Sequence, residues 1–148
     1  MFLIFCQQES TFASSGRLNP FVCDITTDEL TKNIPANSVD VVSMVFVLSA
    51  LPPSEMPFAI KNISRILKPG GTIIFRDYAV GDLAQKRFLR AKEVPKLQNK
   101  LYVRADGTLS YFFEEEFLDS LIENATGGVW EKVKMERVCK TLENRYVI

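Results

Sequence analysis

The chain has 148 residues, of which 47% are hydrophobic and 24% charged, and this composition excludes a wholly disordered chain and allows one domain with a buried core. Its 18 basic and 18 acidic side chains cancel, so any attraction to nucleic acid or membrane must be local. The sequence contains no histidine, which excludes a Ser-His-Asp triad, a histidine general base and histidine-ligated metals, and we expect no metal site.

The cysteines and the first residues indicate an intracellular protein. Three cysteines stand far apart without a C-x-x-C pair, as reduced cysteines do: Cys6, Cys23 and Cys139. Residues 1–6 are apolar but too short for a signal peptide or a membrane span, and we expect no membrane segment. We expect residues 1–19 to be a divergent or poorly ordered segment and residues 20–148 to form the domain.

Two short elements are expected before the longest apolar run. Residues 20–24 predict a short strand that ends in an acid, and Thr26 and Glu29 have the capping-box spacing that opens a short helix. Residues 39–51 are then almost continuously apolar. This run predicts a strand buried on both faces, as parallel strands covered by helices are.

A helix and a second strand follow this run. Ser54 is a candidate N-cap, and the K-P-G-G sequence at 68–71 ends the helix. We expect its buried face to consist of Phe58, Ile63, Ile66 and Leu67. Residues 72–75 predict a second buried strand, which completes a βαβ unit with parallel strands. Ligands bind such sheets beyond the carboxyl ends of the strands, here residues 46–51 and 76–78.

The next segment is basic. Residues 79–100 predict a helix. Residues 86–104 contain seven basic side chains and one acidic side chain, Glu93. The seven are Lys86, Arg87, Arg90, Lys92, Lys96, Lys100 and Arg104. This local excess of positive charge suits contact with RNA phosphates, but most charge runs are solvated surfaces, and the sequence leaves both interpretations open.

The last elements are a hairpin, a helix and a strand. An Asp-Gly pair at 106–107 between the β-rich runs 101–104 and 108–113 predicts a β-hairpin. Residues 114–124 predict a helix with an acidic first turn. Its apolar face is expected to be Phe117, Leu118, Leu121 and Ile122. Residues 129–142 alternate between apolar and charged side chains, which predicts a strand with one exposed face.

Four stretches of this chain resemble a known family. They are F-V-C-D at 21–24, F-V-L-S-A at 46–50, L-K-P-G-G through F-R-D-Y at 67–78, and Y-V-R-A-D-G-T with Y-F-F at 102–113. The chain resembles class I S-adenosylmethionine-dependent methyltransferases over residues 21–142, and within them the eukaryotic family that makes 3-methylcytidine in the anticodon loop of tRNA. The resemblance implies an α/β fold, namely a partial Rossmann-like class I methyltransferase fold with a mostly parallel sheet and a C-terminal β-hairpin insertion.

The resemblance implies three contacts to the cofactor S-adenosylmethionine. Asp24 would accept a hydrogen bond from the adenine amino group, Ile25 would lie beside the adenine ring, and Val45 would line the pocket. From the residues alone, Asp24 is equally well explained as an acid that caps the following helix, and Val45 as a core residue.

The implied reaction needs little acid–base chemistry. N3 of cytosine has a free lone pair at neutral pH, so methyl transfer requires in-line placement rather than a strong base. The product carries a positive charge, which a nearby carboxylate stabilises. Asp77, at the end of the second strand, is the candidate catalytic residue.

Arginine and lysine side chains are candidates for holding RNA phosphates, and tyrosine side chains for stacking on an unpaired base. The predicted RNA-facing residues are Arg76, Tyr78, Lys86, Arg87, Arg90, Tyr102 and Arg104. For Arg76, a network with Asp77 that fixes the strand end is an equally good alternative.

One departure from the family pattern concerns the cofactor. The E/D-x-G-x-G-x-G loop is absent, and Gly16 is the only glycine before Gly70. In this fold the first strand lies at the centre of the sheet, so residues 39–51 would have an unpaired edge unless residues 1–6 fill the gap. We therefore expect a truncated product of a methyltransferase gene that is inactive alone.

The sequence leaves more than one function open. The chain is either the enzyme-derived fragment or a non-catalytic remnant that binds RNA or a protein. A small-molecule methyltransferase is disfavoured because the common members lack the hairpin insertion. The family resemblance implies tRNA as the partner, an aminoacyl-tRNA synthetase or another protein as a second candidate partner, and a place in the cytoplasm or nucleus.

Overall fold

The computed structural model describes residues 19–90 and 96–138, which form two small sheets and three α-helices. The parallel sheet consists of β1 (Val39–Val45) and β2 (Leu67–Arg76), and the antiparallel sheet of β3 (Lys96–Gln98), β4 (Leu101–Val103) and β5 (Leu109–Tyr111). The helices are α2 (Met56–Ile66), α3 (Leu83–Arg90) and α4 (Glu115–Thr126), and two 3-10 turns are η1 (Leu30–Lys32) and η2 (Leu48–Ala50).

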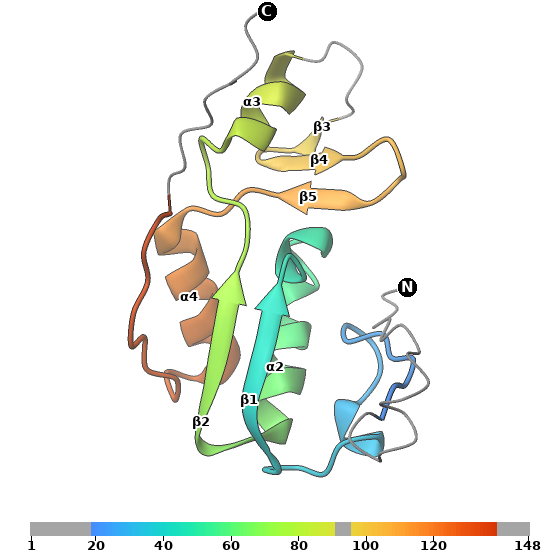
Figure 1. The fold of residues 1–148 in the computed structure, drawn as a ribbon, viewed down its shortest axis with the longest axis vertical. Helices are drawn as coiled ribbons and strands as arrows, with labels where there is room; N and C mark the ends of the chain where they lie inside the picture. Colours follow the sequence, from blue (N-terminus) through green and yellow to red (C-terminus); the bar gives the residue numbers. More distant parts are fainter. Residues whose placement is uncertain (1–18, 91–95, 139–148) are drawn as a thin grey trace, which may run out of the picture.

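The two sheets stand end to end. Helices α2 and α4 lie together on one face of the parallel sheet, and the antiparallel sheet lies beyond the arrowheads of β1 and β2 (Figure 1). Helix α3 packs next to β4 at the far end (Figure 1). The carboxyl ends of the parallel strands therefore face the hairpin, which is where ligands bind in such sheets.

The predicted strand–helix–strand unit is confirmed. β1 and β2 pair in parallel from Val41 opposite Thr72 to Val45 opposite Arg76, and α2 connects them. The fold class predicted from the sequence is therefore confirmed as α/β with a parallel sheet and a separate hairpin.

The predicted boundaries of this unit were partly wrong. β1 ends at Val45 because Phe46 has a positive φ of 54°, which turns the chain into η2 instead of extending the strand to residue 51. Ser54 does not cap α2, which begins at Met56 after Glu55 without a side-chain cap.

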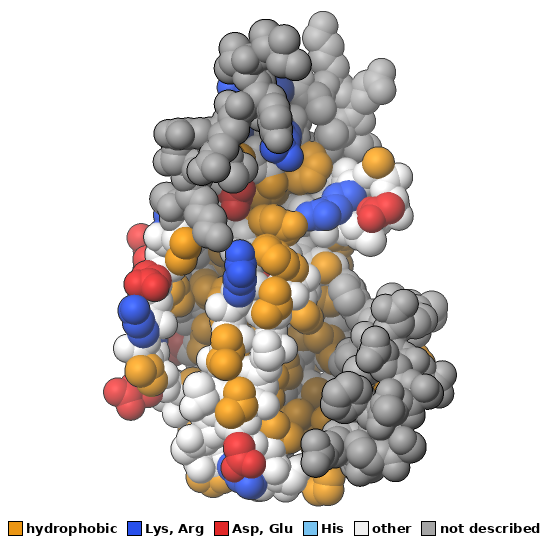
Figure 2. All heavy atoms as spheres, in the orientation of Figure 1, with side chains coloured by type: hydrophobic (Ala, Val, Ile, Leu, Met, Phe, Trp, Pro, Cys, Tyr) orange, Lys and Arg blue, Asp and Glu red, His pale blue; other side chains and the backbone are white. Residues whose placement is uncertain are grey.

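The parallel sheet is buried on one face only, contrary to the expectation from its apolar sequence. Met44 is 4% exposed beneath the helices, whereas Val41, Val45 and Ile74 are 54%, 47% and 55% exposed on the other face. Figure 2 shows hydrophobic side chains over these strands. The exposure arises because, among the residues that the structure describes, no helix covers this face (Figure 1).

The core lies between the sheet and the two helices. Of the four residues predicted to form the buried face of α2, Ile63, Ile66 and the following Leu67 are buried. The fourth, Phe58, points outward and is 62% exposed. The predicted helix over 114–124 is confirmed as α4, whose Leu118 and Leu121 are buried and whose Phe117 and Ile122 pack against the core. Gly127 ends α4 at φ 67°, a left-handed conformation that suits glycine.

The hairpin is confirmed, with Tyr102 opposite Ser110 and Val103 opposite Leu109. The short strand β3, which extends it to three strands, was not predicted. The helix predicted over 79–100 is shorter, because α3 covers only Leu83–Arg90 and residues 91–95 lie outside the described part.

Two predicted strands are not observed. Residues 129–138 form no strand, and Val129, Val133 and Val138 are 80%, 90% and 73% exposed, since no described strand edge is paired with them. The remaining residues of that prediction, 139–142, lie outside the described residues. Residues 20–24 are also not a strand, because no described strand lies beside them to supply hydrogen bonds.

Asn62 on α2 holds the segment before β1 in place. This side chain is 7% exposed, and its amide nitrogen donates to the Ile25 carbonyl at 3.1 Å and to the Asp28 carbonyl at 2.5 Å. Its amide oxygen accepts from the Leu30 N–H at 3.2 Å. One side chain therefore satisfies three backbone groups of this segment.

We expect Asn62→Ala to lower the free energy of unfolding by about 2 kcal/mol, because it leaves buried backbone groups without partners. Urea denaturation followed by circular dichroism measures this loss. Asn33→Ala, in the turn after η1, is the matched control and is expected to change the free energy by less than about 0.5 kcal/mol. Equal losses in both variants would contradict the anchoring role.

Candidate functional site

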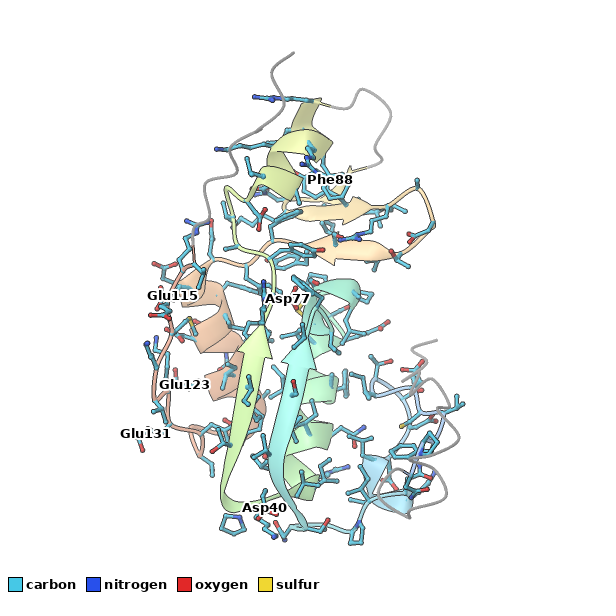
Figure 3. All side chains as sticks on the ribbon, viewed as in Figure 1. Asp40, Asp77, Phe88, Glu115, Glu123 and Glu131 are labelled. Atoms are coloured by element: carbon cyan, nitrogen blue, oxygen red, sulfur yellow. The ribbon has the colours of Figure 1, made fainter. Side chains whose placement is uncertain are left out.

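Asp77 lies directly after β2, where the carboxyl ends of the two parallel strands face the hairpin (Figure 3). Its Oδ2 accepts a hydrogen bond from the backbone N–H of Ser49 at 2.9 Å, and its Oδ1 accepts from the N–H of Tyr78 at 2.9 Å. The bond to Ser49 joins η2 to the end of β2 across 28 residues. Both oxygens are thereby fixed in one orientation.

Burial raises the pKa of the Asp77 carboxyl above its ordinary value of 3.8, and the hydrogen bonds from Ser49 and Tyr78 partly oppose this shift. Removal from water disfavours the charged form, whereas the N–H donors favour it. A desolvated carboxylate held by backbone donors is well suited to stabilise a positive charge that develops next to it.

A pocket opens next to Tyr78, between α3 and the hairpin. It has a volume of about 380 Å³ and is lined by Tyr78, Ala84, Arg87, Phe88 and Arg104, and it is called the arginine pocket below. It combines two guanidinium groups with two aromatic rings, and its lining among the described residues includes no carboxylate. Guanidinium groups bind phosphates and aromatic rings stack on bases, so the pocket suits an unpaired nucleotide.

Arg104 links the hairpin to Tyr78, the residue after Asp77. Its Nε donates to the Ser110 hydroxyl at 2.6 Å, and its Nη2 donates to the Tyr78 hydroxyl. The guanidinium carbon also lies 5.4 Å from the centre of the Tyr78 ring. The hairpin therefore fixes the side chain of Tyr78.

The basic stretch is divided by the fold. Lys86, Arg87 and Arg90 are exposed on α3, next to the arginine pocket. Lys100 instead forms an ion pair with Glu114 and is not part of a free basic surface. Lys92 lies outside the described residues.

Tyr102 is buried in the hairpin, whereas a residue that stacks on an RNA base must be exposed. It is 3% exposed, and its ring stacks on Phe88 at 5.2 Å and 15° and meets Phe112 edge to face at 5.6 Å. An RNA base cannot reach this ring without displacing Phe88. The prediction that Tyr102 stacks on RNA is therefore corrected to a packing role in the hairpin.

Arg76 is oriented by an aromatic ring. Its guanidinium carbon lies 5.7 Å from the centre of the Phe46 ring, an arrangement favoured by cation–π attraction. Among the described residues there is no ion pair between Arg76 and Asp77, so the alternative of an Arg76–Asp77 network is not observed. Contact between Arg76 and RNA stays a prediction.

The three predicted cofactor residues do not form a pocket together. Asp24 Oδ1 accepts from the N–H of Thr26 at 3.0 Å and from its hydroxyl at 2.6 Å, which lowers the pKa of the carboxyl. These bonds close a turn, and Asp24 caps no helix, because η1 begins at Leu30 after Glu29. Ile25 is 5% exposed in the core, whereas Val45 is 47% exposed on the open face of the sheet. Among the residues that the structure describes, these side chains do not line one pocket, and their contacts with the cofactor stay predictions.

Phe46 and Ser49 lie within the predicted binding edge at 46–51 but were not singled out from the sequence, and together with Asp77 they are called the strand-end site below. The Ser49 N–H binds Asp77 through the backbone, which leaves no trace in a motif. Phe46 packs against Tyr78 at 4.8 Å, and its place in F-V-L-S-A was the only available signal. Across the described residues there is no cluster of metal-ligating side chains, and no helix there has the length and apolar character of a membrane span.

Comparisons with known proteins agree with this architecture. A family model described as a methyltransferase domain matches residues 5–126. The tRNA N(3)-methylcytidine methyltransferase trm141 of Schizosaccharomyces pombe is 38% identical over 141 residues, which cover 95% of this chain and 55% of that protein. The tRNA N(3)-cytidine methyltransferase METTL6 of Homo sapiens is 44% identical over 138 residues, 93% of this chain and 46% of that protein.

A relative named for a different activity also matches. O-methyltransferase 3 of Dictyostelium discoideum is 38% identical over 119 residues, 80% of this chain and 27% of that protein. The chain spans about half the length of the two tRNA methyltransferases, 55% and 46%. The matches confirm the family resemblance seen in the sequence motifs. The chain belongs to the methyltransferase domain family, within which it is similar to the tRNA N(3)-cytidine methyltransferases.

Proposed function

We propose that the protein transfers a methyl group from S-adenosylmethionine to N3 of a cytidine in the anticodon loop of tRNA, and that this chain carries the RNA-facing side of the site. The observation that carries the proposal is the Asp77 carboxylate, held by two backbone N–H groups at the carboxyl ends of the parallel strands. The names of the relatives from Schizosaccharomyces pombe and Homo sapiens support N3 of cytidine in tRNA as the target.

The side chains of this site have separate roles in the proposal. The Asp77 carboxylate stabilises the positive charge that forms on the cytosine ring when N3 gains a methyl group. The arginine pocket binds the phosphate and base of an unpaired nucleotide, through Arg87, Arg104 and Tyr78. Lys86 and Arg90 on the exposed surface of α3 extend the contact to further phosphates.

We propose S-adenosylmethionine as the methyl donor because the methyltransferase family implies a donor of this kind. The roles of Asp24, Ile25 and Val45 toward it remain predictions, since the described residues do not bring these side chains into one pocket. The compartment and the partners are also proposals: the cytoplasm or nucleus, with tRNA and with an aminoacyl-tRNA synthetase or another protein as a second partner.

Filter binding of tRNA across a salt series tests the RNA-facing side. Contact with three or four phosphates predicts that log affinity falls with log salt at a slope of roughly −2 to −3. Arg87→Gln is expected to reduce the magnitude of this slope by about 1, because it removes one phosphate contact. Lys68→Gln, which removes a cation paired with Asp40 at the opposite end of the sheet, is the control and should leave the slope unchanged.

Mass spectrometry of nucleosides, after incubation of the chain with tRNA and S-adenosylmethionine, separates the candidate functions. Formation of 3-methylcytidine supports the proposed reaction. Salt-dependent binding without this product favours the non-catalytic RNA-binding function. A product methylated on oxygen would contradict the proposal and agree with the activity named for the Dictyostelium discoideum relative.

A further inference from the structure

Phe46 has a backbone conformation that a phenylalanine rarely adopts. Its φ of 54° lies in the left-handed region, which glycine enters without strain and a bulky side chain does not. The chain turns at this residue: its N–H still donates to the Arg76 carbonyl at 2.8 Å, as in the ladder between β1 and β2, and η2 begins at Leu48. This turn brings the Ser49 N–H to the Asp77 carboxylate.

The turn explains the backbone of Phe46 but not its side chain. Glycine or asparagine would make the same turn with less strain. Burial does not explain the ring either, because Phe46 is 42% exposed and lies outside the core, whereas the neighbouring Leu48 is 1% exposed. A strained residue with an exposed aromatic ring at the carboxyl end of a parallel strand indicates a function in ligand contact.

The Phe46 ring lies against the residues on both sides of Asp77. Its centre is 4.8 Å from that of the Tyr78 ring, and the Arg76 guanidinium carbon is 5.7 Å from it. The ring therefore lies against the side chains of the two residues that flank Asp77 in the sequence. Aromatic rings stack on unpaired bases of any identity, and their faces attract a cation such as an N3-methylated cytosine.

We propose that Phe46 forms one wall of the site for the target cytosine and stacks on the base at the strand end that carries Asp77. This inference rests on the proposed function, because it takes the target base to be a cytosine in RNA. The Tyr78 ring, which Arg104 fixes from the hairpin, packs against the Phe46 ring at 4.8 Å and supports its orientation. The strain at Phe46 thus places an exposed ring where the reacting base lies.

Fluorescence anisotropy with two RNA stem-loops tests the inference: one has a cytidine at the target position of the loop, and the other an abasic site there. We expect Phe46→Gly to weaken binding of the cytidine RNA by about tenfold, because it removes one base–aromatic stack, and to leave binding of the abasic RNA unchanged. Phe46→Tyr keeps the ring and is expected to keep the affinity of the original protein.

Thermal unfolding controls for a structural effect. In Phe46→Gly, relief of the left-handed strain and the added freedom of the unfolded chain oppose each other, so we expect the melting temperature to stay within about 2 °C. Phe58→Ala, which removes an exposed phenylalanine from α2, should affect neither RNA.

The outcomes separate the two proposals. Equal weakening of both RNAs by Phe46→Gly, or no weakening of either, overturns the role of Phe46 and leaves the proposed function intact. If the original protein does not distinguish the cytidine RNA from the abasic RNA, the base does not enter this site and both proposals fail.

Discussion

Phe112→Ala is expected to lower the free energy of unfolding by about 3–5 kcal/mol, which is the usual cost of removing a large buried aromatic side chain. Phe112 is 0% exposed and its ring lies 5.5 Å from that of Tyr78, 6.0 Å from that of Phe88 and 5.6 Å from that of Tyr102. These partners come from the end of β2, from α3 and from β4. One ring therefore joins the hairpin to the strand-end site, and urea denaturation measures its contribution.

Phe58→Ala provides the control for Phe112→Ala, since Phe58 is 62% exposed on α2 and its loss should change the free energy of unfolding by less than about 0.5 kcal/mol. A loss below about 1 kcal/mol in Phe112→Ala would show that the hairpin does not unfold together with the rest of the chain. The expected loss is a large part of the 5–15 kcal/mol that typical domains have.

Local sequence signals predicted the elements whose causes are local. The Asp-Gly pair at 106–107 determined the hairpin, because only a few residues tolerate the backbone of such a turn, and Gly107 indeed has φ 81°. The acidic first turn and apolar spacing of residues 114–124 likewise predicted α4. The K-P-G-G sequence marked the junction between α2 and the paired part of β2.

Elements that depend on distant partners were predicted less well. Residues 20–24 have the composition of a strand, but a strand forms only beside another strand, and none of the described strands lies there. The end of β1 was misplaced because the apolar character of F-V-L-S-A does not reveal the left-handed turn at Phe46. Burial on both faces depends on a second helical layer, which an apolar run alone does not establish.

The same distinction applies to the site. Asp77 was chosen as the candidate because it follows a predicted parallel strand, and the carboxyl ends of such strands form the binding edge of the sheet. Its donor Ser49 was missed because the contact spans 28 residues and uses the backbone. Tyr78 and Tyr102 looked equivalent in the sequence, but Phe88 and Phe112 cover Tyr102, while Tyr78 lines the arginine pocket. Which tyrosine remains available depends on packing between α3 and the hairpin.

Where the chain forms 3-methylcytidine, Asp77→Asn is expected to reduce this formation by about 100-fold, the usual cost of removing one preorganised group that stabilises transition-state charge. The amide has nearly the shape of the carboxylate but no negative charge, and it can accept a hydrogen bond from Ser49 or Tyr78 but not from both. Methyl transfer to tRNA, followed by mass spectrometry of the nucleosides, measures the loss. Asp40→Asn, at the opposite end of the sheet (Figure 3), is the control and should keep full activity.

The raised pKa of Asp77 can be tested through the pH dependence of the unfolding free energy. A carboxyl whose pKa is higher in the folded state than in the unfolded state stabilises the fold below its unfolded pKa, and this contribution is lost as the pH rises through the raised value. Asp77→Asn removes this contribution. The difference in unfolding free energy between the original protein and the variant should therefore change with pH only above the ordinary value of 3.8.

Binding of RNA tests the role of the Asp77 charge without the methyl donor. RNA that contains 3-methylcytidine carries a positive charge on the base, so we expect the original protein to bind it about tenfold more tightly than the cytidine RNA, as one charged hydrogen-bonding contact provides roughly 1.5 kcal/mol. The preference should disappear as the pH falls through the raised pKa of Asp77, because the protonated carboxyl has no charge to offer. Asp77→Asn should show no preference at any pH, and a preference that survives this substitution would assign the stabilisation to another group, such as the Phe46 and Tyr78 rings.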